Sequence, residues 1–172
     1  RMREEGMIAH IGISTVTESQ LRIAQDIAPI VCVQNHYNLI HRDDDAMIDS
    51  LAEQGIAYVP YFPLGGFLPY QADILDQVAS ELDASIQKVS LAWLLQRSPN
   101  ILVIPGTSSR AHLRENIAAA ELTLGELHRE LGRVGVARRR IGQQAGQRRR
   151  REDRENDIGR RHRQAHAEDQ RD

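Results

Sequence analysis

Apolar residues in the first 120 positions alternate between two kinds of pattern. Short runs rich in Ile and Val predict strands, at residues 8–14, 30–34, 56–61 and 101–104. Apolar residues with the spacing of an amphipathic helix lie at about residues 18–27, 43–54, 72–82, 86–97 and 110–120. Strands that alternate with helices in this order predict a parallel sheet joined by crossover helices. Both a doubly wound sheet and a (β/α)8 barrel fit this α/β pattern.

Local signals mark the ends of several of these elements. Thr17 and Gln20 have the spacing of a capping box at the start of the first helix. The acidic run Asp43–Asp45 fits the positive end of the second helix dipole, and Gly55 fits the C-terminal end of that helix. Ser85 fits the N-cap of the fourth helix.

The pattern collapses after Leu124, and the charge balance changes there as well. Residues 1–124 contain 8 Arg and Lys against 15 Asp and Glu, whereas residues 125–172 contain 14 against 9. The second segment is too poor in apolar residues to form a core, so we expect a domain at 1–124 and a disordered Arg-rich tail at 125–172. The ratio of 21 Arg to one Lys in the chain also fits a reading frame of GC-rich DNA that shifts near residue 124.

Composition disfavours several classes of protein. The single cysteine, Cys32, cannot form an intramolecular disulfide, which favours a reducing, cytoplasmic location. We expect no membrane segment, because no apolar run reaches the length of a membrane-spanning helix. We also expect no metal site, because the histidines lack ligand spacing. The Arg-rich tail has almost no aromatic residues to stack on bases, which disfavours nucleic-acid binding. A first residue of Arg1 indicates a piece of a longer protein.

Five short segments, in order along the domain, resemble the second half of the aldo-keto reductase family. They are residues 5–14, 33–38, 61–65, 89–95 and 104–116. Each segment alone has low specificity, but their shared order over about 115 residues is specific. The family folds as a (β/α)8 barrel and reduces carbonyl compounds with NADPH. The resemblance therefore implies that this chain supplies strands five to eight of such a barrel, and it decides between the two folds that the pattern allows.

The resemblance also implies an NADP(H) site at the carboxyl ends of the strands. The implied cofactor-binding residues are Ser14, Gln34, Tyr61, Pro63, Leu64, Gly65, Gly106, Thr107, Ser108, Glu115 and Asn116. Ser14 and Gln34 would hydrogen-bond the nicotinamide carboxamide, and Tyr61 would stack on its ring. Residues 63–65 would follow the pyrophosphate. The turn at 106–108 precedes a helix, so its backbone N–H groups suit a phosphate, and residues 115–116 would meet the adenine.

Three positions depart from the residues that are usual in the family. Thr15 stands where Asn is usual, Gly106 where Lys is common, and His112 where Arg is common. The two missing charges weaken the expected preference for NADPH over NADH. Arg110 lies near them in sequence and is the available substitute.

The catalytic residues of the family are absent from this chain. The family uses an Asp, a Tyr, a Lys and a His from its first four strands, with the Tyr as general acid. No tyrosine here matches that motif, and the single lysine, Lys88, lies in a predicted helix. We therefore expect a cofactor-binding half that is inactive alone, with a small aldehyde or ketone as the substrate of the intact protein. Two alternatives stay open: a non-catalytic NADP(H)-binding or regulatory subunit, and a half barrel that self-associates through its exposed strand edges.

Overall fold

The computed structural model describes residues 1–65, 73–127, 129, 131 and 132 of the chain. All of them belong to one compact unit, Arg1–Val136. The tail that the sequence predicts to be disordered lies outside the described residues, apart from its first few positions. Among these, Leu131 is fully buried against the core, so the packing of this unit continues beyond Leu124.

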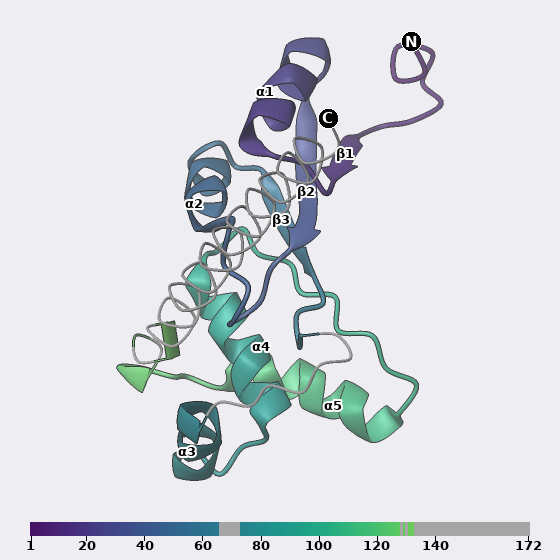
Figure 1. Ribbon diagram of the computed structural model, residues 1–172. Coiled ribbons are helices and arrows are strands. Elements are labelled where there is room, and N and C mark those ends of the chain that lie inside the picture. The colour runs from purple at the N-terminus through teal and green to yellow at the C-terminus, as the bar shows by residue number, and fades with distance from the viewer. Residues whose placement is uncertain (66–72, 128, 130, 133–172) are drawn as a thin grey trace, which may run out of the picture. The chain divides into compact units, whose positions relative to one another are not determined.

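A three-stranded parallel sheet in the order β1-β2-β3 organises this unit (Figure 1). Its strands are Ile11–Ser14 (β1), Ile30–His36 (β2) and Ala57–Tyr61 (β3). At their carboxyl ends Ser14 is in register with Gln34, and His36 is in register with Tyr61. The parallel order confirms the α/β class predicted from the alternating pattern.

The helices begin at the signals that the sequence carries. In the described part of the chain they are Glu18–Ile27 (α1), Asp45–Glu53 (α2), Asp73–Glu81 (α3), Ile86–Arg97 (α4) and Arg110–Ala118 (α5), followed by the 3₁₀ turn Ala119–Glu121 (η1). The predicted capping box is confirmed, because Gln20 N–H donates to Thr17 Oγ1 at 3.3 Å and Thr17 N–H donates to Gln20 Oε1 at 2.8 Å. Ser85 Oγ accepts from Lys88 N–H at 3.1 Å, as expected of the N-cap of α4.

The fourth predicted strand is wrong beyond its first residue, Ile101. That residue forms a single parallel bridge with Tyr58, whose N–H donates to Asn100 O (2.8 Å) and whose carbonyl accepts from Leu102 N–H (2.9 Å). The next N–H of β3 on this side would come from Pro60, which has none. The ladder therefore stops after one bridge.

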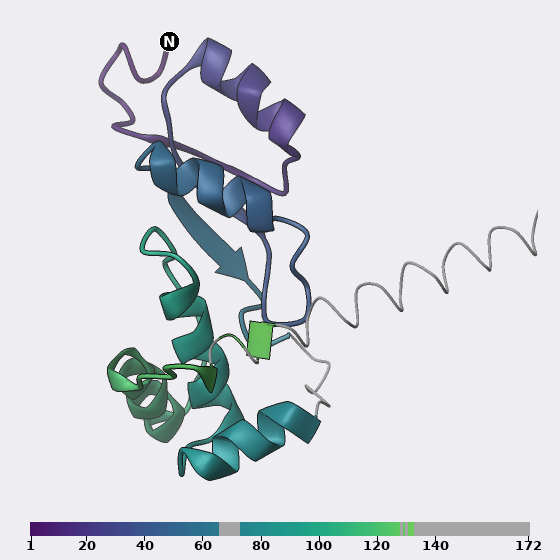
Figure 2. The same cartoon turned by 90° about the vertical axis from the view of Figure 1, so that its left-hand side faces the viewer.

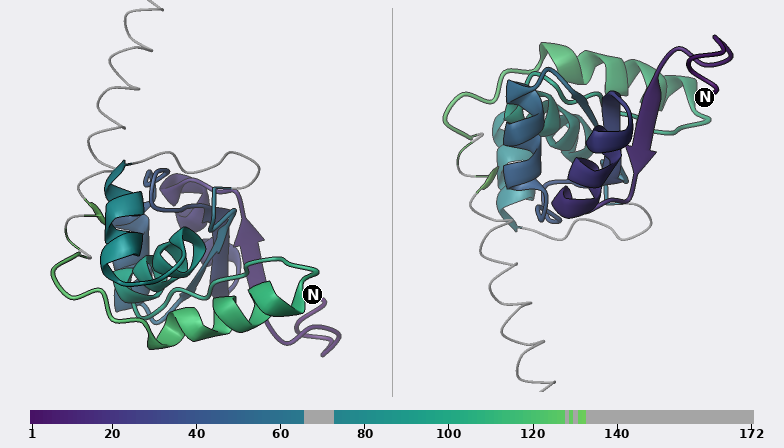
Figure 3. Two further views of the ribbon diagram at one scale, coloured as in Figure 1. Left: turned by 90° about the horizontal axis from the view of Figure 1, so that it is seen from below. Right: turned by 90° about the horizontal axis from the view of Figure 1, so that it is seen from above.

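The two faces of the sheet differ in how well they are covered. Figures 1 and 2 show α1 and α2 on one face, and Figure 3 shows the two helices side by side. Gln25 Nε2 of α1 donates to Gln54 Oε1 at the end of α2 (2.8 Å). Val33 points to this face and is fully buried, whereas Cys32 and Gln34, which alternate with it, are only half-buried. The sheet therefore has one packed face and one open face.

The largest buried side chains connect the packed face to α4. Trp93, Tyr37 and Tyr58 are all fully buried. The Tyr37 ring stacks on Trp93 with 6.2 Å between centroids and meets Tyr58 edge-on at 5.8 Å. The Arg42 guanidinium lies over the Trp93 ring in a cation–π contact, with Cζ 4.9 Å from the ring centroid. This aromatic cluster joins α4 to Tyr37, directly after the carboxyl end of β2, and to Tyr58, near the start of β3.

Candidate functional site

The open face of the sheet collects three of the residues predicted to bind the cofactor. Ser14, Gln34 and Tyr61 all lie at the carboxyl ends of their strands. Side chains alternate along a strand, and the register pairs Ser14 with Gln34 and His36 with Tyr61, so all four residues share this face. Within the described residues, the Gln34 side-chain amide makes no hydrogen bond, and it is only half-buried. Its donor and acceptor are available to a ligand.

The residue after Ser14 has an unusual backbone conformation. Thr15 has a φ of 55°, in the left-handed region that β-branched residues rarely adopt. Its N–H donates to Gln34 O at 2.9 Å, which ties the end of β1 to β2. Asn adopts this conformation more easily than Thr, which gives a backbone reason for the Asn that is usual at this position. The strain falls directly beside the polar group that would meet the ligand.

A buried amide holds the loop that follows Ser14. Asn35 is 5% exposed, and its side chain donates to Val16 O (2.8 Å) and accepts from Val16 N–H (3.0 Å). Its second N–H donates to Asp44 Oδ2 at 2.7 Å. Asp44 Oδ2 also accepts from the Tyr58 hydroxyl at 2.8 Å. The amide thus uses both of its N–H donors and its carbonyl oxygen to connect the β1–α1 loop to the start of α2.

The acidic run at the start of α2 does more than complement the helix dipole. Asp44 is the N-cap residue, but its side chain makes no capping bond because it accepts from Asn35 and Tyr58 instead. Asp45 accepts a 2.5 Å hydrogen bond from the Tyr37 hydroxyl and pairs with Arg42 at 2.9 Å. The interpretation of these acids as helix-start charges alone is therefore incomplete. Their carboxylates anchor two strand ends.

The same contacts keep the hydroxyl groups of two tyrosines protonated. Burial, followed by the hydrogen bond to Asp45, raises the pKa of the Tyr37 phenol well above its usual range. Burial, followed by the nearby Asp44 carboxylate, raises the pKa of the Tyr58 phenol in the same way. Both hydroxyls also donate to carboxylates inside the fold. Each hydroxyl thus ties its tyrosine to the start of α2.

An aromatic cluster that the sequence analysis did not identify lies beside Tyr61. The His36 ring stacks on Tyr61 with 5.4 Å between centroids and on His41 with 4.0 Å. Phe62 meets both His36 and Tyr61 edge-on. Burial, and then the neighbouring His41, lowers the pKa of His36, while Asp43 opposes that shift. The available signal was the strand period: His36 comes two residues after Gln34 and so lies on the same face.

The Pro-Leu-Gly segment forms a tight turn directly after Tyr61. Gly65 N–H donates to Phe62 O at 2.9 Å, and Gly65 has a φ of 81°, which glycine adopts without strain. Pro63 is buried, whereas Leu64 and Gly65 are half-buried. The turn brings a glycine backbone close to the end of β3. The residues at 66–72 lie outside the described part of the chain.

Gly106, Thr107 and Ser108 lie directly before the N-cap of α5, Ser109. Ser109 N–H donates to Thr107 Oγ1 (3.1 Å), and His112 N–H donates to Ser109 Oγ (3.4 Å), which caps the helix. The N–H groups of Arg110 and Ala111 have no hydrogen-bond partner among the described residues, as expected in the first turn of a helix. Gly106 has open space where a Cβ would point. These features make an exposed N-terminus that suits an anion.

Glu115 and Asn116 lie on α5, one turn further along, and are half-buried. Their side chains form no hydrogen bond with the other described residues. No hydrogen bond in the described part of the chain joins the α5 residues to Ser14, Gln34 or Tyr61. The predicted residues thus fall into two groups that no hydrogen bond connects among the described residues, one at the sheet and one at α5.

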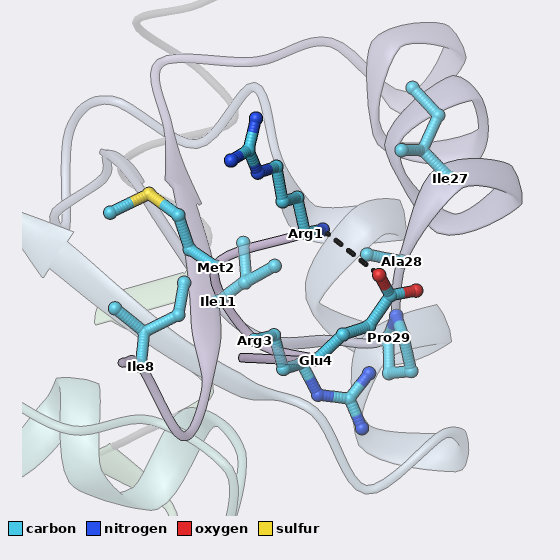
Figure 4. Close-up of a pocket in the computed structure, with 9 residues that line it drawn as sticks. All are labelled: Arg1, Met2, Arg3, Glu4, Ile8, Ile11, Ile27, Ala28 and Pro29. Carbon is cyan, nitrogen blue, oxygen red and sulfur yellow. Dashed lines mark ion pairs between the residues drawn. The ribbon is translucent and has the colours of Figure 1, made fainter. Parts of the chain in front are cut away.

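A cavity elsewhere in the unit contains none of the predicted site residues. It is lined by Arg1, Met2, Arg3, Glu4, Ile8, Ile11, Ile27, Ala28 and Pro29. Figure 4 shows Met2, Ile8 and Ile11 beside the free edge of β1, with the Arg1 amine paired to Glu4 at 3.5 Å. The cavity lies at the end of β1 opposite to Ser14. Across the described residues, no group of three or more His, Cys, Asp or Glu side chains could hold a metal ion.

Comparison with known proteins identifies the family. The model of the Aldo/keto reductase family matches residues 1–128. The chain belongs to the aldo/keto reductase family. It is 63% identical over 125 residues to pyridoxine 4-dehydrogenase of Escherichia coli, covering 73% of this chain and 44% of that protein. It is 43% identical over 124 residues to an uncharacterised oxidoreductase of Schizosaccharomyces pombe, covering 72% and 40%. The chain therefore spans less than half the length of these relatives.

Solved structures of aldo-keto reductases have the same fold as this family member. A thermostable aldo-keto reductase in complex with the inhibitor epalrestat superposes with a TM-score of 0.71 at 31% identity, over 78% of this chain and 51% of that one. An aldo/keto reductase from Klebsiella pneumoniae, in complex with NADP and acetate, gives 0.67 at 25% identity, over 77% and 50%. These neighbours imply a (β/α)8 barrel fold. Among the described residues, none of the helices has the length and apolar character needed to span a membrane.

Proposed function

We propose that this chain is the NADP(H)-binding half of an NADPH-dependent carbonyl reductase, and that it contributes strands five to eight of a (β/α)8 barrel. The observation that carries the proposal is the grouping of Ser14, Gln34 and Tyr61 at the carboxyl ends of three parallel strands on one open face. In (β/α)8 barrels, ligands bind at this end of the strands. A carboxamide and a flat ring are the features of nicotinamide that such a group can recognise.

The residues present fit the rest of the cofactor by their chemistry. Two unpartnered N–H groups at the start of α5, together with the hydroxyls of Thr107 and Ser108, suit the adenosine 2′-phosphate. The exposed guanidinium of Arg110 lies in the same turn. The open space at Gly106 lets a phosphate approach the backbone. A Lys is absent there, so the preference for NADPH over NADH rests on hydroxyls, N–H groups and Arg110.

NADPH supplies a hydride when it is bound, and this chain's residues would hold and orient it. Gln34 and Ser14 would bind the carboxamide, which selects the ring face turned toward the substrate. The Asp, Tyr, Lys and His of the family's catalytic set are absent here, so a partner segment has to supply the proton. We propose a small carbonyl compound as substrate. The aldehyde that corresponds to pyridoxine is the first to test, because pyridoxine 4-dehydrogenase is 63% identical.

The sharpest test of the proposed function is NADPH binding by the 172-residue chain. We expect NADPH fluorescence to change on titration with the chain, and Tyr61→Ala to weaken binding about tenfold, because ring stacking contributes roughly 1–3 kcal/mol. Ile23→Ala is the matched control, since Ile23 is exposed on α1, away from the open face. We expect it to bind like the unaltered chain.

Two outcomes would contradict the proposed function. Unaltered affinity in Tyr61→Ala would remove Tyr61 from the site. Steady oxidation of NADPH by the purified chain on addition of an aldehyde would show that it carries its own catalytic residues. Binding without turnover is the expected result. A non-catalytic NADP(H)-binding or regulatory subunit gives that result too. Adding a chain that contains the first four strands distinguishes the two roles, because only a reductase half then oxidises NADPH.

A second candidate function, self-association as a half barrel, is favoured by the residues at the two free edges. Ile27 of α1, which lines the same cavity as Ile11 of β1, is 81% exposed, and in the segment after Ile101 the side chains of Leu102 and Ile104 are 56% and 47% exposed. All strands run in the same direction, so two copies can be related by a two-fold axis. The Ile101 edge of each copy then lies against β1 of the other copy. The net charges of the two helices are opposite but small, because α1 carries Glu18, Asp26 and Arg22, with Arg22 paired to Glu18, whereas α5 carries Arg110, Arg114 and Glu115. The occupant we propose for both edges is therefore a second copy of this chain.

Analytical ultracentrifugation tests this candidate directly. We expect a monomer–dimer equilibrium in the micromolar range, and at least a tenfold weaker dimer in Ile27→Glu, since a buried charge at an apolar contact costs about 1.4 kcal/mol or more. Glu53→Gln, at an exposed position on α2, is the control and should leave the equilibrium unchanged. A monomer at all concentrations would contradict self-association and leave the cofactor proposal standing.

Two further predictions accompany this proposal. A cytoplasmic location rests on the single, unpaired Cys32, whose thiol pKa is raised by burial. The origin of the Arg-rich tail, as a natural extension or a shifted frame, is decided by resequencing the coding DNA.

A further inference from the structure

His36 lies beside the proposed cofactor site, but it is not among the residues proposed to bind the cofactor. It points to the open face in register with Tyr61, and the two rings are nearly parallel, with an angle of 10° between them. The His41 ring is nearly parallel to His36 as well, at 12°. Three rings, those of Tyr61, His36 and His41, therefore form one stacked column. Tyr61 is the ring of this column that the cofactor would contact.

The hydrogen bonds around His36 select its neutral form. Asn38 Oδ1 accepts from the N–H groups of Ile40 (3.0 Å) and His41 (2.9 Å), and Asn38 Nδ2 donates to Phe62 O (3.1 Å). These contacts determine the orientation of the Asn38 amide, so the group that lies 3.3 Å from His36 Nε2 is a donor. A neutral His36 can accept that bond with Nε2. A protonated His36 would place N–H against N–H.

The charged and titratable groups that face His36 come from two elements. The segment after β2 supplies His41 and Asp43, and His41 Nε2 lies 3.6 Å from Asp43 Oδ2. β3 supplies the Tyr61 phenol. Asp43 favours a cationic His36, whereas burial and a cationic His41 oppose it, and the balance lowers the pKa of His36 from its ordinary value of 6.5. His36 therefore gains its charge at a lower pH than an unperturbed imidazole does.

We propose that His36 determines which redox state of the cofactor this site binds more tightly. This inference rests on the proposed function. The oxidised nicotinamide ring carries a positive charge and the reduced ring carries none. With neutral His36, the column accepts either ring against Tyr61. With cationic His36, a like charge lies one ring away from oxidised nicotinamide, and that state is rejected while the reduced state is retained. The histidine thus favours NADPH over NADP⁺ as the pH falls.

The test compares the two affinities in the same 172-residue chain between about pH 5 and about pH 8. NADPH is titrated by its fluorescence, and NADP⁺ by competition with NADPH. Both carry the same 2′-phosphate, so protonation of that group cancels in the ratio of the two Kd values. We expect the ratio Kd(NADP⁺)/Kd(NADPH) to rise about three- to tenfold toward low pH, the effect of two like charges at ring-to-ring separations in a partly exposed site.

Two variants make the test specific to His36. His36→Phe keeps a stacked ring and removes the charge, so we expect its ratio to be independent of pH. His41→Phe is the matched control: it keeps His36 and removes the repulsion of His41, so the rise should persist and move to higher pH. By linkage, NADP⁺ should also lower the pKa of His36 in an NMR titration, and NADPH should not.

The possible results separate this inference from the proposed function. A pH-independent ratio in the unaltered chain, with both ligands bound, overturns the role of His36 and leaves the cofactor site standing. A rise that persists unchanged in His36→Phe overturns it as well, since another group would then be responsible. Failure of both ligands to bind at any pH rejects the proposed function, and this inference with it.

Discussion

Trp93→Ala should lower the free energy of unfolding by about 3–5 kcal/mol, the range for large aromatic deletions in a packed core. Trp93 is fully buried on α4, and it contacts Tyr37 by stacking and Arg42 through its π face. Deleting the indole leaves a cavity between α4 and Tyr37, the residue that follows β2. Small domains unfold with about 5–15 kcal/mol, so this loss is a large fraction of the total.

Urea denaturation followed by far-UV circular dichroism is the appropriate measurement. Fluorescence cannot be compared between the variants, because Trp93 is the single tryptophan of the chain. Trp93→Phe preserves a stacked ring and should cost about 1–2 kcal/mol, so it reports on the same contact even if the alanine variant does not fold. Leu102→Ala, at a side chain that is 56% exposed, is the control and should change stability by less than about 0.5 kcal/mol. A loss below about 1 kcal/mol in Trp93→Ala would contradict the packing of α4 on the sheet.

Asn35→Leu should cost about 3 kcal/mol, because it strands several polar groups with little change in side-chain volume. The substitution removes the partners of Val16 N–H and Val16 O, and it takes one of two donors from Asp44 Oδ2. Val16 is only half-buried, so water can satisfy part of what is lost there, which limits the effect. The consequence reaches the candidate site, since this clamp holds the loop directly after Ser14.

Two measurements separate this effect from general loss of packing. Denaturation gives the free energy of unfolding. In amide hydrogen exchange, we expect Val16 N–H to lose its protection in Asn35→Leu. The amides of α4 should keep the protection that the global stability of the variant allows. Gln25→Ala is the matched control, because it removes a side-chain amide whose bond to Gln54 is exposed, and we expect a change below about 0.5 kcal/mol. Retained protection at Val16 would show that the clamp does not hold the loop.

The sequence predicted the elements well where local physics decides them. The capping box at Thr17, the Ser85 cap and the apolar runs of β2 and β3 depend on neighbours within a few residues, and the structure confirms them. The strand predicted at 101–104 does not form, because strand pairing there depends on the neighbouring strand and not on these residues alone. Pro60, on a different strand, removes the N–H that would have continued the ladder.

The residues of the candidate site also differ in whether local sequence signals predict their positions. Motif order identified the family, and the strand period was enough to place Ser14, Gln34 and Tyr61 on one face once their strands were known to be parallel neighbours. The period also contained His36, but nothing local indicated that His41, five residues later, would stack on it. That contact depends on the course of the loop after β2, which Asn38 determines through hydrogen bonds to three backbone groups.

By itself, the sequence determined the α/β class, the helix starts and the family, because apolar period, capping residues and motif order are written along the chain. Tertiary structure alone decided how the acids at the start of α2 are used. Asp44 and Asp45 were expected to complement a helix dipole, yet they bind Asn35, Tyr58 and Tyr37 from the ends of two strands. A carboxylate accepts hydrogen bonds from whichever donors the fold brings to it, and those donors are distant in sequence until the sheet forms.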